Sequence, residues 1–122
     1  MKRIIVLSAI FALLSGSIVH AKRNAPKDVP SITRSKVEYR APHAQMGCVE
    51  AWQGKTLIWR RQIYVVKYTV GLERDVQDVF IKTIELKGNV LVVTNERKSE
   101  YEVDLDTLQV KVLKGTLLEK RK

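Results

Sequence analysis

Residues 79–112, VFIKTIELKGNVLVVTNERKSEYEVDLDTLQVKV, hold the clearest alternation of apolar and polar residues in this chain. Gly88-Asn89 separates two apolar runs, and glycine at the first central position is what a type II′ hairpin turn requires. In the following run Tyr101, Val103 and Leu105 alternate with acidic residues, so one face of that strand is apolar. The stretch therefore predicts an antiparallel meander.

Two further turns complete the four strands of this meander. Asn95–Lys98 is a polar connection of four residues, and Asp106-Thr107 is a turn in which we expect the Asp side chain to bond its own backbone. After this turn Leu108, Val110 and Val112 point to one face of the last strand.

Upstream, Gly47–Trp52 and Thr56–Tyr68 predict another strand pair around Gln53-Gly54-Lys55. The longer strand has large apolar residues on both faces, so we expect it to be the covered centre of the fold. Val70–Gln77 breaks the pattern and could hold one helical turn. Together the patterns predict an all-β domain, a small antiparallel meander sheet or half-open barrel of about six to seven strands.

Residues 1–21 have the organisation of a secretory signal peptide: a basic start, an apolar run too short to span a bilayer, and small residues at the cleavage site. We therefore expect a secreted or periplasmic protein with no transmembrane span after cleavage. The predicted organisation continues with a flexible basic leader at 22–35, a β domain at 36–114 and a basic C-terminal tail at 115–122.

Charge is the strongest global feature of the mature chain. The expected signal contains two of the 22 Lys and Arg residues and none of the 13 acids, so the formal net charge after cleavage is +7. Such a charge favours an anionic surface, glycan or protein partner in the envelope or outside the cell, and we expect no nucleic acid there. Excess Lys also keeps a small domain soluble, which is the simpler interpretation.

Cys48 is the single cysteine, so the domain has no intramolecular disulfide and its core must hold the fold. With His43 and Met46 it forms a His-x-x-Met-x-Cys set, a weak candidate for a Cu(I) site because soft sulfur ligands select that ion. Met46 and Cys48 also suit two core residues on one strand face, which is the interpretation that we favour. The sequence predicts neither a bound metal nor another cofactor.

The candidate binding residues are cations interleaved with aromatic side chains, a combination that binds polyanions and glycans on sheet surfaces. They are Trp52, Lys55, Arg60, Arg61, Lys67, Lys120, Arg121 and Lys122. Arg60 and Arg61 point to opposite faces of one strand, so they cannot belong to one patch. The alternative is that the aromatic rings are core residues and the cations extend from the core into solvent.

Five acidic residues are candidates for a cation-binding or catalytic site: Glu73, Asp75, Asp78, Asp104 and Asp106. A hard-cation site or a glycosidase pair needs several carboxylates held together by the fold, which this spacing does not indicate. We interpret these residues as turn-capping and surface-pairing groups.

Two segments resemble the repeat of PQQ-type β-propellers. Tyr101, Asp104 and Thr107 match the Tyr-x-x-Asp-x-x-Thr part of that repeat, and Val49–Lys55 followed by Trp59 is similar to it. Because a propeller needs about four or more blades, the resemblance implies a single bladelike meander. More broadly the chain is similar to small exported bacterial proteins of unknown function, which implies no activity.

From these features we predict an exported, non-catalytic binding or interaction protein for anionic envelope components. The alternative is a protein inhibitor of an envelope or extracellular hydrolase, whose target would be acidic. A small metal-binding protein or hydrolase is the third hypothesis. The sequence does not define the oligomeric state.

Overall fold

A computed structural model describes residues 26–121 of the chain, and within this range every regular element is a β-strand. The predicted signal peptide at 1–21 and Lys122 lie outside the described residues. No segment from 26 to 121 forms a helix with the length and apolar character needed to cross a bilayer. The all-β class predicted from the sequence is confirmed.

Ten strands follow one another along the described residues. They are β1 (Ile32–Arg34), β2 (Val37–Arg40), β3 (Cys48–Gln53), β4 (Thr56–Gln62), β5 (Val65–Val66), β6 (Ile81–Lys87), β7 (Val90–Asn95), β8 (Glu100–Asp104), β9 (Val110–Lys114) and β10 (Leu118–Glu119). Seven of them have four or more residues, and β1, β5 and β10 are shorter.

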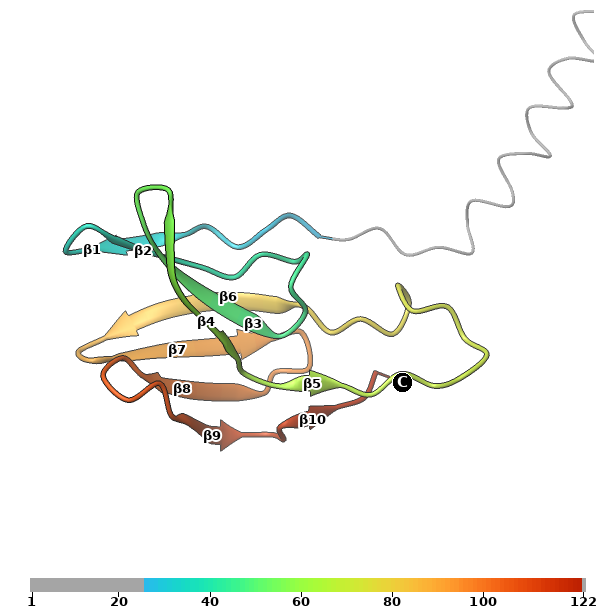
Figure 1. Cartoon of the computed structure of the whole chain (residues 1–122). Helices are drawn as coiled ribbons and strands as arrows, with labels where there is room; N and C mark the ends of the chain where they lie inside the picture. Colours follow the sequence, from blue (N-terminus) through green and yellow to red (C-terminus); the bar gives the residue numbers. More distant parts are fainter. Residues whose placement is uncertain (1–25, 122) are drawn as a thin grey trace, which may run out of the picture.

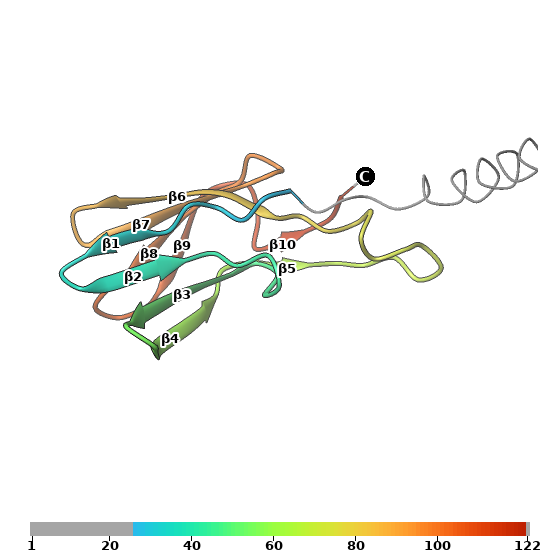
Figure 2. The same ribbon diagram turned by 90° about the horizontal axis from the view of Figure 1, so that it is seen from above.

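Two four-stranded antiparallel sheets form the body of the protein. One has the order β1-β2-β3-β4 and the other β6-β7-β8-β9, so each is a simple meander (Figure 1). Seen from above, the two sheets lie as separate layers (Figure 2). The meander predicted from residues 79–112 is the second sheet, and its Lys87↔Val90 register places Gly88-Asn89 at the tip of a two-residue hairpin.

The core lies between the inner faces of the two layers. Val49 and Ala51 from β3 are fully buried, as are Leu91 and Val93 from β7. Strand β8 shows the period of two that a strand with one buried face requires, because Tyr101 and Val103 are fully buried and their neighbours in the strand are only partly buried. Tyr101 of β8 stacks on the ring of Tyr64, which follows β4, with centroids 5.5 Å apart.

The predicted central strand is instead two separate elements. Its first part, β4, is the last strand of its sheet, and most of its side chains are exposed. Ile58, expected to be covered, is 48% exposed at a bulge where Trp52 pairs with Leu57 and Ala51 pairs with Trp59. A bulge and charged side chains are common protections for an edge strand.

The β1–β2 hairpin has a strained turn. Arg34 pairs with Val37, leaving Ser35 and Lys36 as the two turn residues, and their φ angles are +54° and +67°. Two successive positive φ angles define a type I′ turn, which Asn-Gly adopts at the lowest cost. The sequence pattern did not predict this hairpin because Ser-Lys is not a typical turn pair.

The two ends of the described chain differ from the prediction. The expected basic tail at 115–122 contains β10, which pairs in parallel with β5 and buries the side chain of Glu119. The expected leader at 22–35 contains β1, whose Ile32 packs against the core. Both segments are short and mostly polar, so their own composition gave no sign of the pairing partners that order them.

The turn at 106–108 also differs in detail. The carboxylate that shapes it is that of Asp104, which accepts from the backbone N–H of Asp106 at 2.8 Å and of Thr107 at 3.0 Å. These N–H groups lower the pKa of Asp104. Asp106, expected to play this part, accepts from the Asn89 side chain in the neighbouring turn.

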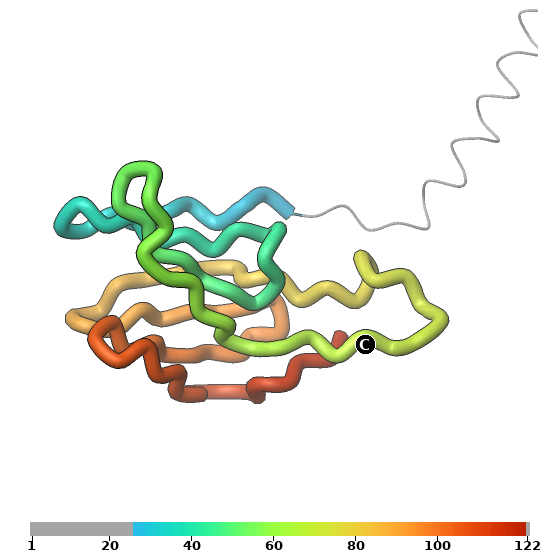
Figure 3. The backbone as a smooth tube through the Cα atoms, viewed as in Figure 1, coloured from blue at the N-terminus to red at the C-terminus, as the bar shows by residue number. Residues whose placement is uncertain are grey.

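The segment from Thr69 to Gln77 is a loop of turns without a helix, so the helical turn considered from the sequence is absent there. In Figure 3 this loop, hereafter the 69–77 loop, extends beyond both sheets at the end of the molecule where the described chain finishes.

Candidate functional site

A basic cleft lies at this same end of the sandwich. It consists of two adjoining hollows of about 260 and 270 Å³ that share Glu96 and Arg121 in their walls. The charged and ionisable lining residues are Lys27, His43, Lys82, Glu96, Arg97, Lys98 and Arg121. Five of these described residues are Lys or Arg and one is acidic, so the lining has a strong positive excess.

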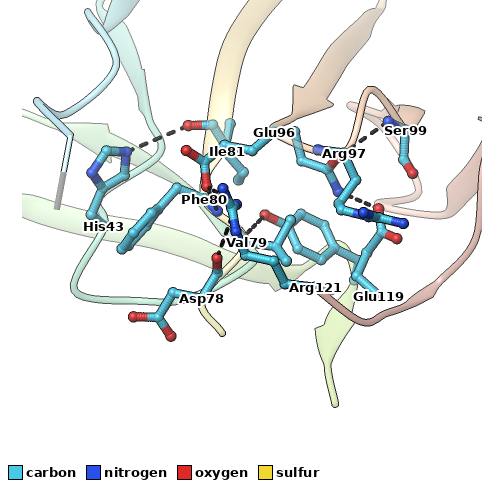
Figure 4. A network of polar contacts seen from close by, with 12 residues as sticks. His43, Asp78, Val79, Phe80, Ile81, Glu96, Arg97, Ser99, Glu119 and Arg121 are labelled. Carbon is cyan, nitrogen blue, oxygen red and sulfur yellow. Dashed lines mark hydrogen bonds and ion pairs between the residues drawn. The ribbon is translucent and has the colours of Figure 1, made fainter. Parts of the chain in front are cut away.

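Glu96 and Arg121 line both hollows, and they belong to the network of polar contacts drawn in Figure 4. The Arg121 Nη1 donates to Glu96 Oε1 at 3.1 Å, and the same carboxylate oxygen accepts from the backbone N–H of Phe80 at 3.1 Å. Both side chains are partly exposed, so the ion pair itself adds little stability. Its main effect is to hold the guanidinium at a fixed place beside open space.

Asn95 shapes the turn that presents the next two cations. Its buried side-chain oxygen accepts from the backbone N–H of Arg97 at 2.9 Å and of Ser99 at 3.2 Å. Its amide nitrogen donates to Glu119 Oε2 at 2.6 Å. The fully buried side-chain amide of Asn95 thus links the β7–β8 turn to Glu119 of β10, and Glu119 lies two residues before Arg121 in the sequence.

Tyr101 completes this buried polar cluster. Its hydroxyl donates to the backbone oxygen of Thr116 at 2.5 Å and lies 3.4 Å from Glu119 Oε2. Burial is the main cause that raises the pKa of Tyr101 to about 12. The phenol therefore stays protonated and available as a donor below that pH.

His43 forms the opposite side of the cleft. Its ring packs on Phe80 with centroids 4.5 Å apart, and its Nε2 lies 3.4 Å from the backbone oxygen of Ile81. Its Nδ1 lies 2.9 Å from the backbone oxygen of Pro26 and 3.4 Å from the Asp28 carboxylate. These contacts attach the segment before β1 to the start of β6.

The outer face of the first sheet has a second polar network, which contains two of the predicted binding residues. Glu50, only 4% exposed, accepts from the Trp52 indole at 2.9 Å and from Arg60 Nε at 2.7 Å. Arg40 lies over the Trp52 ring, 4.7 Å from its centroid, and donates to Glu38 at 2.6 Å. These bonds to Arg40, together with one from Ser31, lower the pKa of Glu38. In this structure Trp52 and Arg60 bind other residues of the same sheet.

The remaining predicted cations lie on separate elements. Arg61 donates to the backbone oxygen of Leu108 at 2.8 Å, whereas Arg60 pairs with Glu50, so the two arginines use opposite faces as expected. Lys55 is at the exposed tip of the β3–β4 hairpin. Lys67 and Lys120 are exposed beside β5 and β10, and Lys122 lies outside the described residues. Of the predicted residues within 26–121, only Arg121 lines the basic cleft.

The weak metal candidates have different surroundings. Cys48 is buried, and its thiol donates to Gln62 Oε1 at 3.2 Å, while burial raises its pKa. Met46 packs against the core, and His43 faces backbone oxygens in the cleft. Among residues 26–121 no group of three or more His, Cys, Asp or Glu side chains is placed to hold a metal ion.

Sequence reasoning missed most of the cleft residues. Lys27, Lys82 and the Glu96-Arg97-Lys98 turn come from three distant segments, and the fold alone brings them to Arg121. The available signal was the charge of the 95–98 turn, where four polar residues include two adjacent cations.

The fold and cleft define the protein as a small two-sheet β-sandwich with a positively charged end. A scan against protein-family models and a search of curated proteins both find no match to this chain.

Proposed function

We propose that this chain is an exported, non-catalytic binding protein that recognises an anionic group of an envelope component. The observation that supports this proposal most strongly is the basic cleft, whose lining has five cationic side chains and one carboxylate. That carboxylate is already engaged by Arg121 and by the Phe80 N–H. Positive charge in a partly enclosed hollow attracts anions more strongly than the same charges spread over a surface.

The chemical class of the ligand is a phosphate, or a sulfate of similar shape. The planar Arg121 and Arg97 groups suit tetrahedral oxyanions because a guanidinium can donate two parallel hydrogen bonds. Lys82 and Lys98 supply further charges from neighbouring walls. Each hollow is large enough for one such group with part of its carrier, and smaller than a typical drug-binding pocket.

The test is calorimetric titration of the purified protein with pyrophosphate. Lys82→Gln with Lys98→Gln removes two charges from the cleft, whereas Lys36→Gln with Lys55→Gln removes two charges from hairpin turns away from it. Both double variants have the same net charge, so the comparison separates the cleft from the global field. We expect the cleft variant to bind about tenfold more weakly and the hairpin variant to bind like the wild type. Equal affinities of the two variants would refute the proposal.

Salt provides a second measurement on the same protein. Attraction between exposed charges weakens as the Debye length falls from about 10 Å at 0.1 M salt to about 3 Å at 1 M. Pyrophosphate affinity should therefore drop steeply over that range. The alternatives, a hydrolase inhibitor and a metal-dependent protein, stay hypotheses that pull-down from envelope extract and metal analysis would test.

A further inference from the structure

The 69–77 loop, which joins β5 to β6, projects from one end of the two sheets (Figure 1). It continues from β5, and after the loop Asp78 leads into β6, whose first residues line the cleft. Arg121 Nη1 lies 3.5 Å from the backbone oxygen of Asp78. The loop is therefore connected to the cleft through Asp78, the residue that directly follows it.

A buried glutamine holds this loop in one shape. The Gln77 side chain is 5% exposed, and its oxygen accepts from the Thr69 N–H at 2.5 Å. Its amide nitrogen lies 3.1 to 3.3 Å from the backbone oxygens of Thr69, Leu72 and Glu73. One side chain thus serves four backbone groups, which removes the conformational freedom expected of a loop this exposed.

Two aliphatic side chains occupy the tip of this braced loop. Val70 is 98% exposed and Leu72 is 60% exposed, with Gly71 between them. Single exposed aliphatic residues are common, but a rigid loop that presents two of them beyond the body of the protein is a typical interaction element. Rigidity favours binding because little ordering entropy is lost when the tip is buried.

Charged residues of both signs lie in and beside the loop. Val65 of β5 and Leu118 of β10 are register partners, and each is more than half exposed. The exposed Lys67 and Lys120 directly follow these two strands. The Arg74 guanidinium stacks on the Tyr68 ring, 3.8 Å from its centroid. Glu73 and Asp75 flank Arg74 in sequence, so acidic groups are present on the returning side of the loop.

We propose that this end of the sandwich docks on an anionic phospholipid surface, with Val70 and Leu72 inserted below the headgroups and the basic cleft holding headgroup phosphate. An anionic bilayer places phosphates directly above an apolar layer, which matches an apolar tip beside a basic hollow. The inference rests on the proposed function and names the lipid as the source of the phosphate.

The test compares vesicles of phosphatidylcholine with and without phosphatidylglycerol, using cosedimentation of the purified protein. Val70→Ser with Leu72→Ser removes the apolar tip, and Leu57→Ser with Ile58→Ser is the matched control because both of its residues are exposed aliphatics on β4. We expect the loop variant to bind the anionic vesicles at least about tenfold more weakly than the control, since two apolar contacts are lost.

Pyrophosphate binding separates this inference from the proposed function. A loop variant that loses vesicle binding but keeps its pyrophosphate affinity supports both. A loop variant that binds anionic vesicles like the wild type overturns the lipid inference and leaves the cleft proposal intact, and vesicle binding equally strong without phosphatidylglycerol overturns it as well. Normal pyrophosphate binding by the Lys82→Gln, Lys98→Gln variant overturns both.

Nitroxide-labelled lipid in the same vesicles gives an independent readout. Amide signals of residues 69–77 should broaden in the bound protein, while those of residues 54–58 at the β3–β4 hairpin should not. Equal broadening at both places, or none at the loop, would contradict insertion of the tip.

Discussion

Gly47→Ala should be among the most destabilising small substitutions in this protein. Gly47 has a φ of +70°, and an added Cβ would lie 2.3 Å from the backbone oxygen of Tyr64. The surrounding chain has little room to move, because the Gly47 oxygen accepts from the Ile63 N–H at 2.7 Å and Tyr64 is almost fully buried. The substitution therefore combines an unfavourable backbone conformation with a clash against backbone.

Gly54→Ala is the matched control for this effect. Gly54 has a similar φ of +60°, but no atom lies within 4 Å of the Cβ that would be added. An alanine there should cost about 1 kcal/mol, the penalty of a left-handed conformation alone. Gly47→Ala should cost about 3 kcal/mol or more, because displacement of packed backbone adds to that penalty.

Urea unfolding followed by tryptophan fluorescence measures both costs. With a slope of about 1.5 kcal/mol per molar urea, the midpoint should fall by about 2 M for Gly47→Ala and by less than about 1 M for Gly54→Ala. The slopes should stay equal, which would show that stability and not the denatured state has changed. Equal midpoints for the two variants would refute the close approach of Gly47 to Tyr64.

Three other outcomes follow from particular residues. Ser35→Asn with Lys36→Gly should raise the free energy of unfolding by about 0.5 to 1 kcal/mol, because both positions have positive φ angles that Asn and Gly adopt more easily. Thermal unfolding measures this gain, and a melting temperature below that of the wild type would contradict the type I′ turn. The free energy of unfolding should fall between pH 10 and pH 12, because burial raises the pKa values of Tyr68 and Tyr101 to about 12 and the unfolded chain binds fewer of these protons. Urea unfolding at a series of pH values measures this fall, and Tyr68→Phe with Tyr101→Phe should make it smaller. The same dependence on pH in the variant and the wild type would contradict the two raised pKa values. The Cys48 thiol should react with a disulfide reagent at pH 8 far more slowly in the native protein than in urea, since burial raises its pKa, and equal rates would contradict that burial.

The second sheet was predictable because its information is local. In β8 apolar and acidic residues alternate, and the Gly88-Asn89 turn sets the first register without any distant contact. The prediction of a central strand at residues 56–68 was wrong because the position of this segment depends on a distant pairing partner. Apolar residues on both faces of Thr56–Tyr68 indicated a central strand, but the chain leaves the first sheet after Gln62 and pairs with β10 instead.

The candidate site could not be predicted from spacing. Its cations come from the segment before β1, from β6, from the β7–β8 turn and from the residue pair after β10, and only the closed fold places them together. Net charge indicated an anionic partner, yet it could not indicate which of the many Lys and Arg residues would share a hollow. The signal for the 69–77 loop was equally indirect, because Gln77 resembles any polar loop residue until its four backbone partners are known.

The pairing of β5 with β10 joins Val65 to Leu118, which lie 53 residues apart in the sequence. Until residues 118–119 are available, the buried amide of Asn95 lacks its Glu119 partner and β5 has no neighbouring strand. The sandwich thus cannot complete its hydrogen bonding while the chain is being made or moved as an extended thread. The long sequence separation of the β5–β10 pair raises the contact order of the fold, and such long-range closure slows folding.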